Sequence, residues 1–125
     1  MPRFVILEHS PTETSGKPLH WDLMLETDAG LLTWALATVP TENQTIPAEP
    51  LPIHRARYLD YEGPISGNRG RVRQWDNGSF RWLQQTDRMR VHLQGTRMDV
   101  TVTIDHPADA QRCQVHFGKP TSDSD

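Results

Sequence analysis

Hydrophobic and polar residues alternate without interruption over residues 19–26, which read Leu19-His20-Trp21-Asp22-Leu23-Met24-Leu25-Glu26. The odd-numbered residues are all apolar, and the even-numbered residues place a histidine and an aspartate on the opposite face. Strict alternation over this length is typical of a half-buried β-strand. The pattern therefore predicts a strand whose odd-numbered face packs into the core.

Similar patterns predict several other short strands. Residues 3–9 contain a continuous apolar run, which indicates a strand that can be buried on both faces. Residues 31–37 follow the predicted strand 19–26 after a short turn, so these two strands are expected to form a hairpin. Two alternating segments, 89–93 and 98–104, predict a final antiparallel hairpin.

Turn signals divide the remaining chain. Asn77-Gly78 favours a type I′ turn, so we expect a hairpin that joins strand 71–76 to strand 80–83. Prolines at positions 40, 47, 50 and 52 predict an irregular connection over residues 38–52. The polar segment 10–18 is interpreted as an exposed, mobile loop.

About seven or eight short strands with little helix predict an all-β, mainly antiparallel fold. We expect a small closed or partly closed β-barrel, and a β-sandwich is the alternative architecture. Residues 1–106 are predicted to form the single domain. Residues 107–125 are expected to be a C-terminal extension that is flexible at its end.

Composition narrows the functional classes. A chain of 125 residues is long enough for one domain, and its net charge of −3 excludes a generally basic surface, so a nucleic-acid partner would need a local patch. The single cysteine, Cys113, allows no internal disulfide. We find no signal-peptide pattern and no membrane-length apolar run. We therefore expect a cytoplasmic monomer that does not act at a membrane.

The predicted strand over residues 19–26 carries the clearest candidate chemistry. His20 and Asp22 lie two residues apart on one strand face, roughly 6.5–7 Å along the strand. At that spacing an imidazole and a carboxylate can both reach one divalent ion above the sheet. The alternative is a surface strand that carries two polar residues without a ligand.

An ordered set of short motifs resembles the 3′-phosphoesterase domain of bacterial DNA ligase D and its free-standing relatives. The motifs are His9, Leu19-His20-Trp21-Asp22, Trp34-Ala35, His54 with Tyr58, Tyr61-Glu62-Gly63 and Trp75-Asp76-x-Gly78. The resemblance extends from about Phe4 to Ile104. It implies a small β-barrel that uses manganese to trim a 3′-terminal ribonucleotide and then to remove the remaining 3′-phosphate.

The resemblance also implies roles for individual residues. His9, His20 and Asp22 match the metal ligands, and we expect them to meet in the mouth of the barrel around Mn²⁺, with Zn²⁺ or another divalent ion as alternatives. His54 matches a catalytic histidine that contacts the phosphate, and Tyr58 matches the tyrosine beside it. The implied partners are 3′ ends of DNA or a primer-template, and a ligase or polymerase of an end-joining pathway.

One departure from the family pattern concerns the phosphate. The family strand reads His-x-Asp-x-Arg, whereas Met24 stands at the arginine position here. Four nearby arginines are candidate phosphate-binding residues or parts of an ordinary solvated face: Arg55, Arg57, Arg69 and Arg71.

The sequence leaves three functions open. The first is a metal-dependent phosphodiesterase and phosphomonoesterase, a hydrolase of DNA repair with nuclease-like action on 3′ ends. The second is a non-catalytic metal-containing module that binds nucleic-acid ends or another phosphorylated ligand. The third is an esterase of the same fold that acts on a small phosphorylated molecule.

Overall fold

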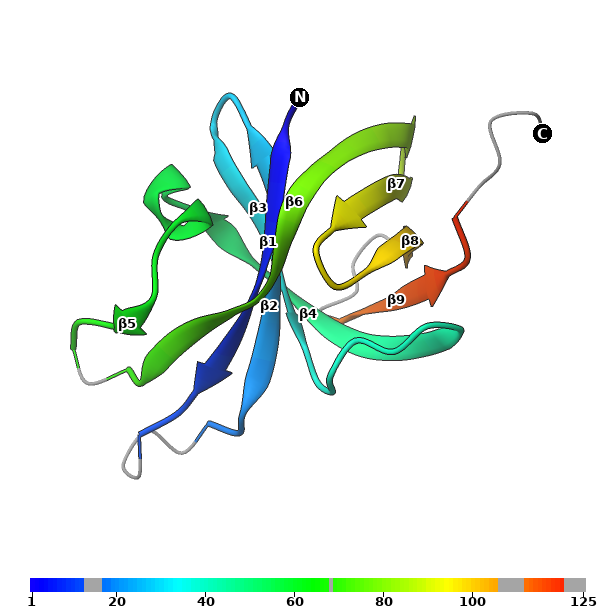
Figure 1. Ribbon diagram of the computed structural model, residues 1–125. Helices are drawn as coiled ribbons and strands as arrows, with labels where there is room; N and C mark the ends of the chain where they lie inside the picture. Colours follow the sequence, from blue (N-terminus) through cyan, green and yellow to red (C-terminus); the bar gives the residue numbers. More distant parts are fainter. Residues whose placement is uncertain (13–16, 68, 106–111, 121–125) are drawn as a thin grey trace.

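The computed structural model describes residues 1–12, 17–67, 69–105 and 112–120 (Figure 1). Its elements are β1 (Arg3–Ser10), β2 (His20–Thr27), β3 (Gly30–Leu36), β4 (Gln44–His54), η1 (Ala56–Leu59), β5 (Gly63–Pro64), β6 (Arg71–Gln85), β7 (Arg88–Gly95), β8 (Asp99–Asp105) and β9 (Cys113–Gly118). Within these ranges the 3₁₀ turn η1 is the single helical element, and no helix has the length and apolar character needed to span a bilayer.

The strands form one closed antiparallel barrel. Neighbouring strands follow the order β1-β2-β3-β4-β9-β8-β7-β6, and β6 pairs back with β1. Each strand of the ring pairs with a neighbour on both sides over at least part of its length, so closure leaves little open edge in the wall of the barrel. The short strand β5 adds to β6 outside this ring. The predicted all-β barrel is therefore confirmed.

Strand β1 is buried on both faces, as its continuous apolar run predicted. Phe4 and Ile6 belong to the core inside the barrel, together with Leu23 of β2. Val5 and Leu7 point to the outside of the wall, where they form a second apolar cluster with Met24 and four other buried or partly buried aliphatic residues. The wall formed by β1 and β2 thus separates two apolar cores.

The outer core is covered by the segment between β4 and β6. Leu59 of η1 is 3% exposed and packs in the outer cluster, against which Tyr58, Tyr61 and Ile65 also pack. Figure 1 shows η1 and β5 outside the barrel, to one side of β1. The segment between β4 and β6 therefore partly encloses the outer face of β1 and β2.

The prediction of an irregular connection over residues 38–52 is wrong in its second half. Strand β4 begins at Gln44 and includes prolines 47, 50 and 52. Residues 44–48 pair with β9, and residues 48–54 pair with β3. Proline is tolerated where a strand lacks a second partner, which is the case for the part of β4 beyond Ala48.

The prediction of a hairpin at Asn77-Gly78 is also wrong, because β6 runs straight through both residues. Gly78 pairs with Phe4 of β1 on one side and with Gly95 of β7 on the other. A Cβ atom on Gly78 would lie 2.1 Å from the carbonyl oxygen of Gln94. Gly78 therefore permits β6 and β7 to approach closely. A strand glycine of this kind and the glycine of a tight turn look the same in the local sequence.

A buried carboxylate holds the same region. Asp76 is 3% exposed, and its Oδ1 accepts the backbone N–H groups of Asn77 and Arg97 at 2.8 and 2.9 Å. Its Oδ2 accepts the N–H of Met98 at 2.9 Å. These bonds connect β6 to the turn between β7 and β8.

Strand β9 comes from the segment 107–125, where the sequence analysis placed an extension. Cys113, Val115 and Phe117 are buried in the barrel core, and the strand pairs with both β4 and β8. The ring is therefore completed by residues beyond position 106.

We expect Gly78→Ala to lower the free energy of unfolding by about 2 kcal/mol or more, because the new methyl group collides with backbone rather than with a movable side chain. Urea titration followed by tryptophan fluorescence measures this change. Gly118→Ala is the matched control, since its Cβ would be no closer than 3.4 Å to a neighbour, and we expect a change within about 0.5 kcal/mol. Equal effects of the two substitutions would contradict this account of Gly78.

Candidate metal centre

The register of β1 and β2 brings the three predicted ligands together. His9 pairs directly with His20, and Asp22 pairs with Leu7, which points to the outer side of the wall. Side chains two residues apart share a face, so Asp22 lies on the same side as Met24. The site is therefore on the outer face of the wall, not in the mouth of the barrel as expected.

Asp22 lies at the centre of this group and is 3% exposed. Its Oδ2 lies 3.2 Å from Nδ1 of His9, and its Oδ1 lies 3.2 Å from Nε2 of His20. The second contact lacks hydrogen-bond geometry, so Oδ1 is a buried oxygen without a hydrogen-bond partner among the described residues. The ring centroids of the two histidines are 4.5 Å apart.

Backbone carbonyls determine which ring nitrogen of each histidine faces Asp22. Nδ1 of His20 lies 3.1 Å from the carbonyl oxygen of Pro18, and Nε2 of His9 lies 2.8 Å from that of Arg69. A carbonyl accepts only, so each of these nitrogens carries a proton that it donates. In a neutral ring the remaining nitrogen directs a lone pair at the carboxylate, whereas in a protonated ring it donates, as Nδ1 of His9 is placed to do toward Oδ2. This arrangement requires a cation between the groups, either a proton or a metal ion.

The pKa shifts agree with a site that attracts a cation. Burial of the Asp22 carboxylate favours its neutral form, but contacts with His20 and His9 outweigh burial and lower its pKa. Burial of the His20 ring opposes its charged form, but the contact with Asp22 outweighs burial and raises its pKa. A metal ion that binds here would displace the proton that these contacts stabilise.

The donor set fits a divalent metal ion. One ligand atom from each of His9, His20 and Asp22 can be chosen so that all three lie within 4.8 Å of one another. Donors bonded to one ion at about 2.0–2.2 Å are at most roughly 4.4 Å apart, so only a small adjustment is needed. Histidines that bind metal usually donate their second N–H to a carbonyl or carboxylate, as both histidines do here.

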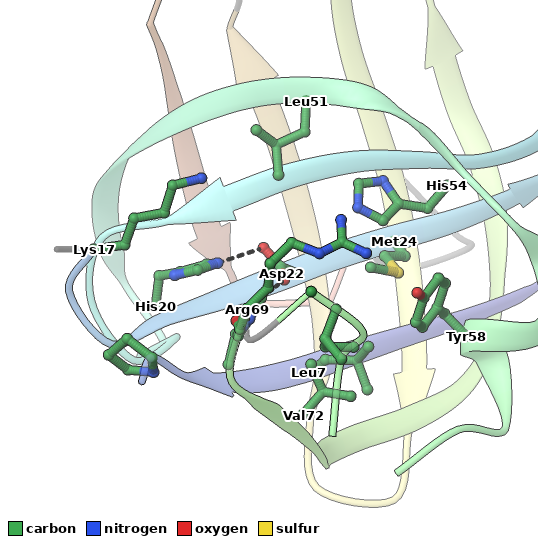
Figure 2. A pocket seen from close by; sticks show the side chains of 14 residues that line it. Leu7, Lys17, His20, Asp22, Met24, Leu51, His54, Tyr58, Arg69 and Val72 are labelled. Carbon is green, nitrogen blue, oxygen red and sulfur yellow. Dashed lines mark hydrogen bonds and ion pairs between the residues drawn. The ribbon is translucent and has the colours of Figure 1, made fainter. Parts of the chain in front are cut away.

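A pocket of about 460 Å³ opens beside this group. Figure 2 shows His20 and Asp22 at one side of the pocket and His54 and Tyr58 at the other, with Met24 between them. The pocket therefore brings the candidate metal ligands and the candidate catalytic residues to one cavity, although β1 and η1 are far apart in the sequence.

His54 is held at the end of β4 by a hydrogen bond to the backbone and by packing against an aromatic ring. Its Nδ1 lies 2.8 Å from the carbonyl oxygen of Pro52, so Nδ1 is the donor and Nε2 is the nitrogen that can act on a ligand. The ring packs edge-on against Tyr58 with centroids 5.9 Å apart, and Tyr58 packs in the same way on Tyr61. This aromatic row sets the positions of His54 and Tyr58 in the pocket.

The four candidate arginines occupy different places. Arg69 lines the pocket, whereas Arg57 places its guanidinium over the rings of Tyr58 and Tyr61, 5.3 and 5.0 Å from their centroids. This cation–π contact holds the guanidinium of Arg57 on the tyrosine rings, and Arg57 does not line the pocket.

The other two arginines lie outside the pocket. Arg71 lines a separate cavity together with Glu8, Glu62 and Arg73, and Arg55 is exposed beside η1. Of the four, the structure brings only Arg69 to the wall of the candidate site.

Sequence reasoning missed one cation of the pocket. Lys17 lines the cavity on the side of His20, at the end of the polar loop. The available signal was its position three residues before His20, which keeps it within a short length of chain from that ligand.

A barrel wall with two imidazoles and a carboxylate beside a pocket defines a candidate metal-binding β-barrel protein. Residues 9–106 match the family model of the DNA ligase D 3′-phosphoesterase domain. The match covers most of the 125-residue chain, and the chain therefore belongs to this family. No curated protein matches the chain. The resemblance inferred from the ordered motifs is confirmed.

We expect His20→Ala to weaken Mn²⁺ binding by more than about 100-fold, because loss of a direct ligand costs more than the loss of a supporting contact. Electron paramagnetic resonance of free Mn²⁺ during a titration measures the affinity. His116→Ala is the control, since His116 lies on the exposed outside of β9 and bonds to Thr45. Unchanged Mn²⁺ affinity in His20→Ala would remove His20 from the ligand set.

Proposed function

We propose that the protein is a manganese-dependent 3′-phosphoesterase that trims 3′-ribonucleotide and 3′-phosphate ends of DNA in end repair. The observation that carries this proposal is the buried carboxylate of Asp22, toward which Nδ1 of His9 and Nε2 of His20 both point at 3.2 Å. Membership of the 3′-phosphoesterase family supports the reaction class.

His9, His20 and Asp22 would hold the metal, and three protein ligands leave positions for water and a phosphate oxygen. Nitrogen and oxygen donors of this kind suit Mn²⁺ and also Zn²⁺. When bound, the metal polarises the phosphoryl group and lowers the pKa of a bound water. Hydrolysis of a 3′-phosphate forms a bond from the water oxygen to phosphorus and breaks the bond from phosphorus to the 3′ oxygen, which takes up a proton.

His54 is suited to the opposite side of the phosphate. With Nδ1–H held by Pro52, a protonated ring offers Nε2–H to a phosphate oxygen or to the leaving 3′ oxygen. Tyr58 fixes the ring from the side and contributes its own hydroxyl to the pocket. Together these residues bind and orient the phosphate, while the metal ligands remain on the other side.

The proposed substrate is the 3′ end of a DNA strand, alone or in a primer-template. Because the net charge is −3, attraction for DNA must come from the cations near the pocket rather than from the whole surface. A 3′-hydroxyl product would serve a ligase or polymerase of an end-joining pathway.

The direct test uses purified protein, Mn²⁺ and a primer-template that ends in one 3′-ribonucleotide or in a 3′-phosphate. We expect conversion to a 3′-hydroxyl end that a polymerase can extend, and no conversion with Asp22→Asn protein. Mn²⁺ and DNA-end binding without any conversion would instead support the non-catalytic module, which Met24 in place of the family arginine favours.

We expect His54→Ala to slow 3′-end trimming on the order of 100-fold, comparable to the loss of one preorganised donor, while Mn²⁺ affinity stays unchanged. Single-turnover rates at saturating Mn²⁺ measure the effect. His116→Ala serves again as the control, with an expected wild-type rate. If His54→Ala trims 3′ ends at the wild-type rate, His54 is not a catalytic residue.

A further inference from the structure

The strand position that should supply a phosphate-binding cation is apolar in this chain. Met24 is 2% exposed, belongs to the outer apolar cluster, and lines the pocket between Asp22 and His54. A thioether offers no proton to a phosphate oxygen. A phosphate in the pocket therefore receives no cation from β2 beyond the metal centre, and the charge must come from another element.

Arg69 also lines the pocket, but it comes from the turn before β6 and not from β2. Figure 2 shows its side chain extending across the pocket, with the guanidinium toward Met24. Its Nε donates to the carbonyl oxygen of Ser66 at 2.7 Å, and its Nη2 donates to the Ser66 hydroxyl at 3.2 Å. Both oxygens of Ser66 are uncharged, so these bonds orient the guanidinium without neutralising it.

The backbone around Arg69 is anchored at the metal centre. Its carbonyl accepts the Nε2–H of His9 at 2.8 Å. Gly70 has φ +101° and packs so closely that a Cβ would lie 2.1 Å from the carbonyl oxygen of Ser10. The carbonyl of Gly70 also accepts the N–H of Ile65 at 2.7 Å, which closes the turn. Arg69 thus sits on a backbone that is docked against the end of β1.

We propose that Arg69 is the phosphate-binding arginine of this chain, moved from the strand to the turn before β6. The proposal rests on the proposed function, because it assigns a residue to the phosphate of the same site. One residue then serves both sides of the pocket: its carbonyl orients a metal ligand, and its guanidinium binds the phosphate. A guanidinium fork matches two phosphate oxygens.

The neighbouring cations are less suited to this role. Arg57 is engaged with Tyr58 and Tyr61, and Arg71 lines the separate cavity. Lys17 lies at the His20 side of the pocket and offers a point charge rather than a planar fork.

Arg69→Met tests the proposal, because it removes the guanidinium and keeps the backbone carbonyl that His9 uses. The probe is inorganic phosphate, added to the full-length Mn²⁺-loaded protein and followed by isothermal titration calorimetry. We expect a loss of phosphate affinity of at least about tenfold, as for a lost charge-assisted hydrogen bond. Mn²⁺ affinity, measured by electron paramagnetic resonance, should stay within about twofold of wild type.

Two further variants make the test specific. Arg73→Met is the matched control, since Arg73 is also an exposed β6-side arginine but pairs with Glu8; its phosphate affinity should equal that of wild type. In the Arg69→Met background, Met24→Arg places a guanidinium at the family position and should restore phosphate binding.

The outcomes separate this proposal from the one it rests on. Phosphate affinity of Arg69→Met equal to that of wild type, with normal Mn²⁺ binding, overturns the role of Arg69 and leaves the metal centre intact. A wild-type protein that binds no Mn²⁺ overturns both proposals. An equal loss in Arg73→Met also overturns the role of Arg69, because the effect would then follow from overall charge.

Discussion

The buried carboxylate of Asp22 is the constraint on which the site depends. A charged group that is 3% exposed is stable only with compensating partners. Nδ1 of His9 and Nε2 of His20 lie 3.2 Å from its two oxygens, so a proton or a metal ion between them supplies the compensation, and each ring is itself oriented by a backbone carbonyl. The two carbonyls come from Pro18 and Arg69, so the loops on both sides of the strand pair determine how the carboxylate is satisfied. The site consequently attracts a cation before any substrate is present.

The position of this carboxylate depends on a wall with two apolar faces. Inside the barrel, Phe4 and Ile6 pack in the main core, and outside it, Val5 and Leu7 pack under η1. The outer core keeps the segment between β4 and β6 against β1 and β2. Without that cover the ligands would lie on an open strand surface, and His54 would have no fixed relation to Asp22. The pocket is therefore a consequence of burying both faces of β1.

Local sequence was sufficient for elements whose pattern has a single structural cause. Alternation over residues 19–26 and the ordered motifs predicted the barrel, the family and the residues that meet at Asp22. Local sequence was misleading where one pattern has two causes. Gly78 serves a close approach of strands rather than a turn, and the prolines of β4 occupy a strand with one partner along part of its length.

The sequence by itself determined that His20 and Asp22 share one strand face, because side-chain alternation is a property of the extended backbone. Only the tertiary structure decided that this face is covered from outside the barrel and opens onto a pocket, since the cover comes from η1, which follows β4 in the chain. It also decided which arginine reaches the pocket. Arg69 and His9 are 60 residues apart, and their contact follows from barrel closure between β1 and β6, which no local pattern encodes.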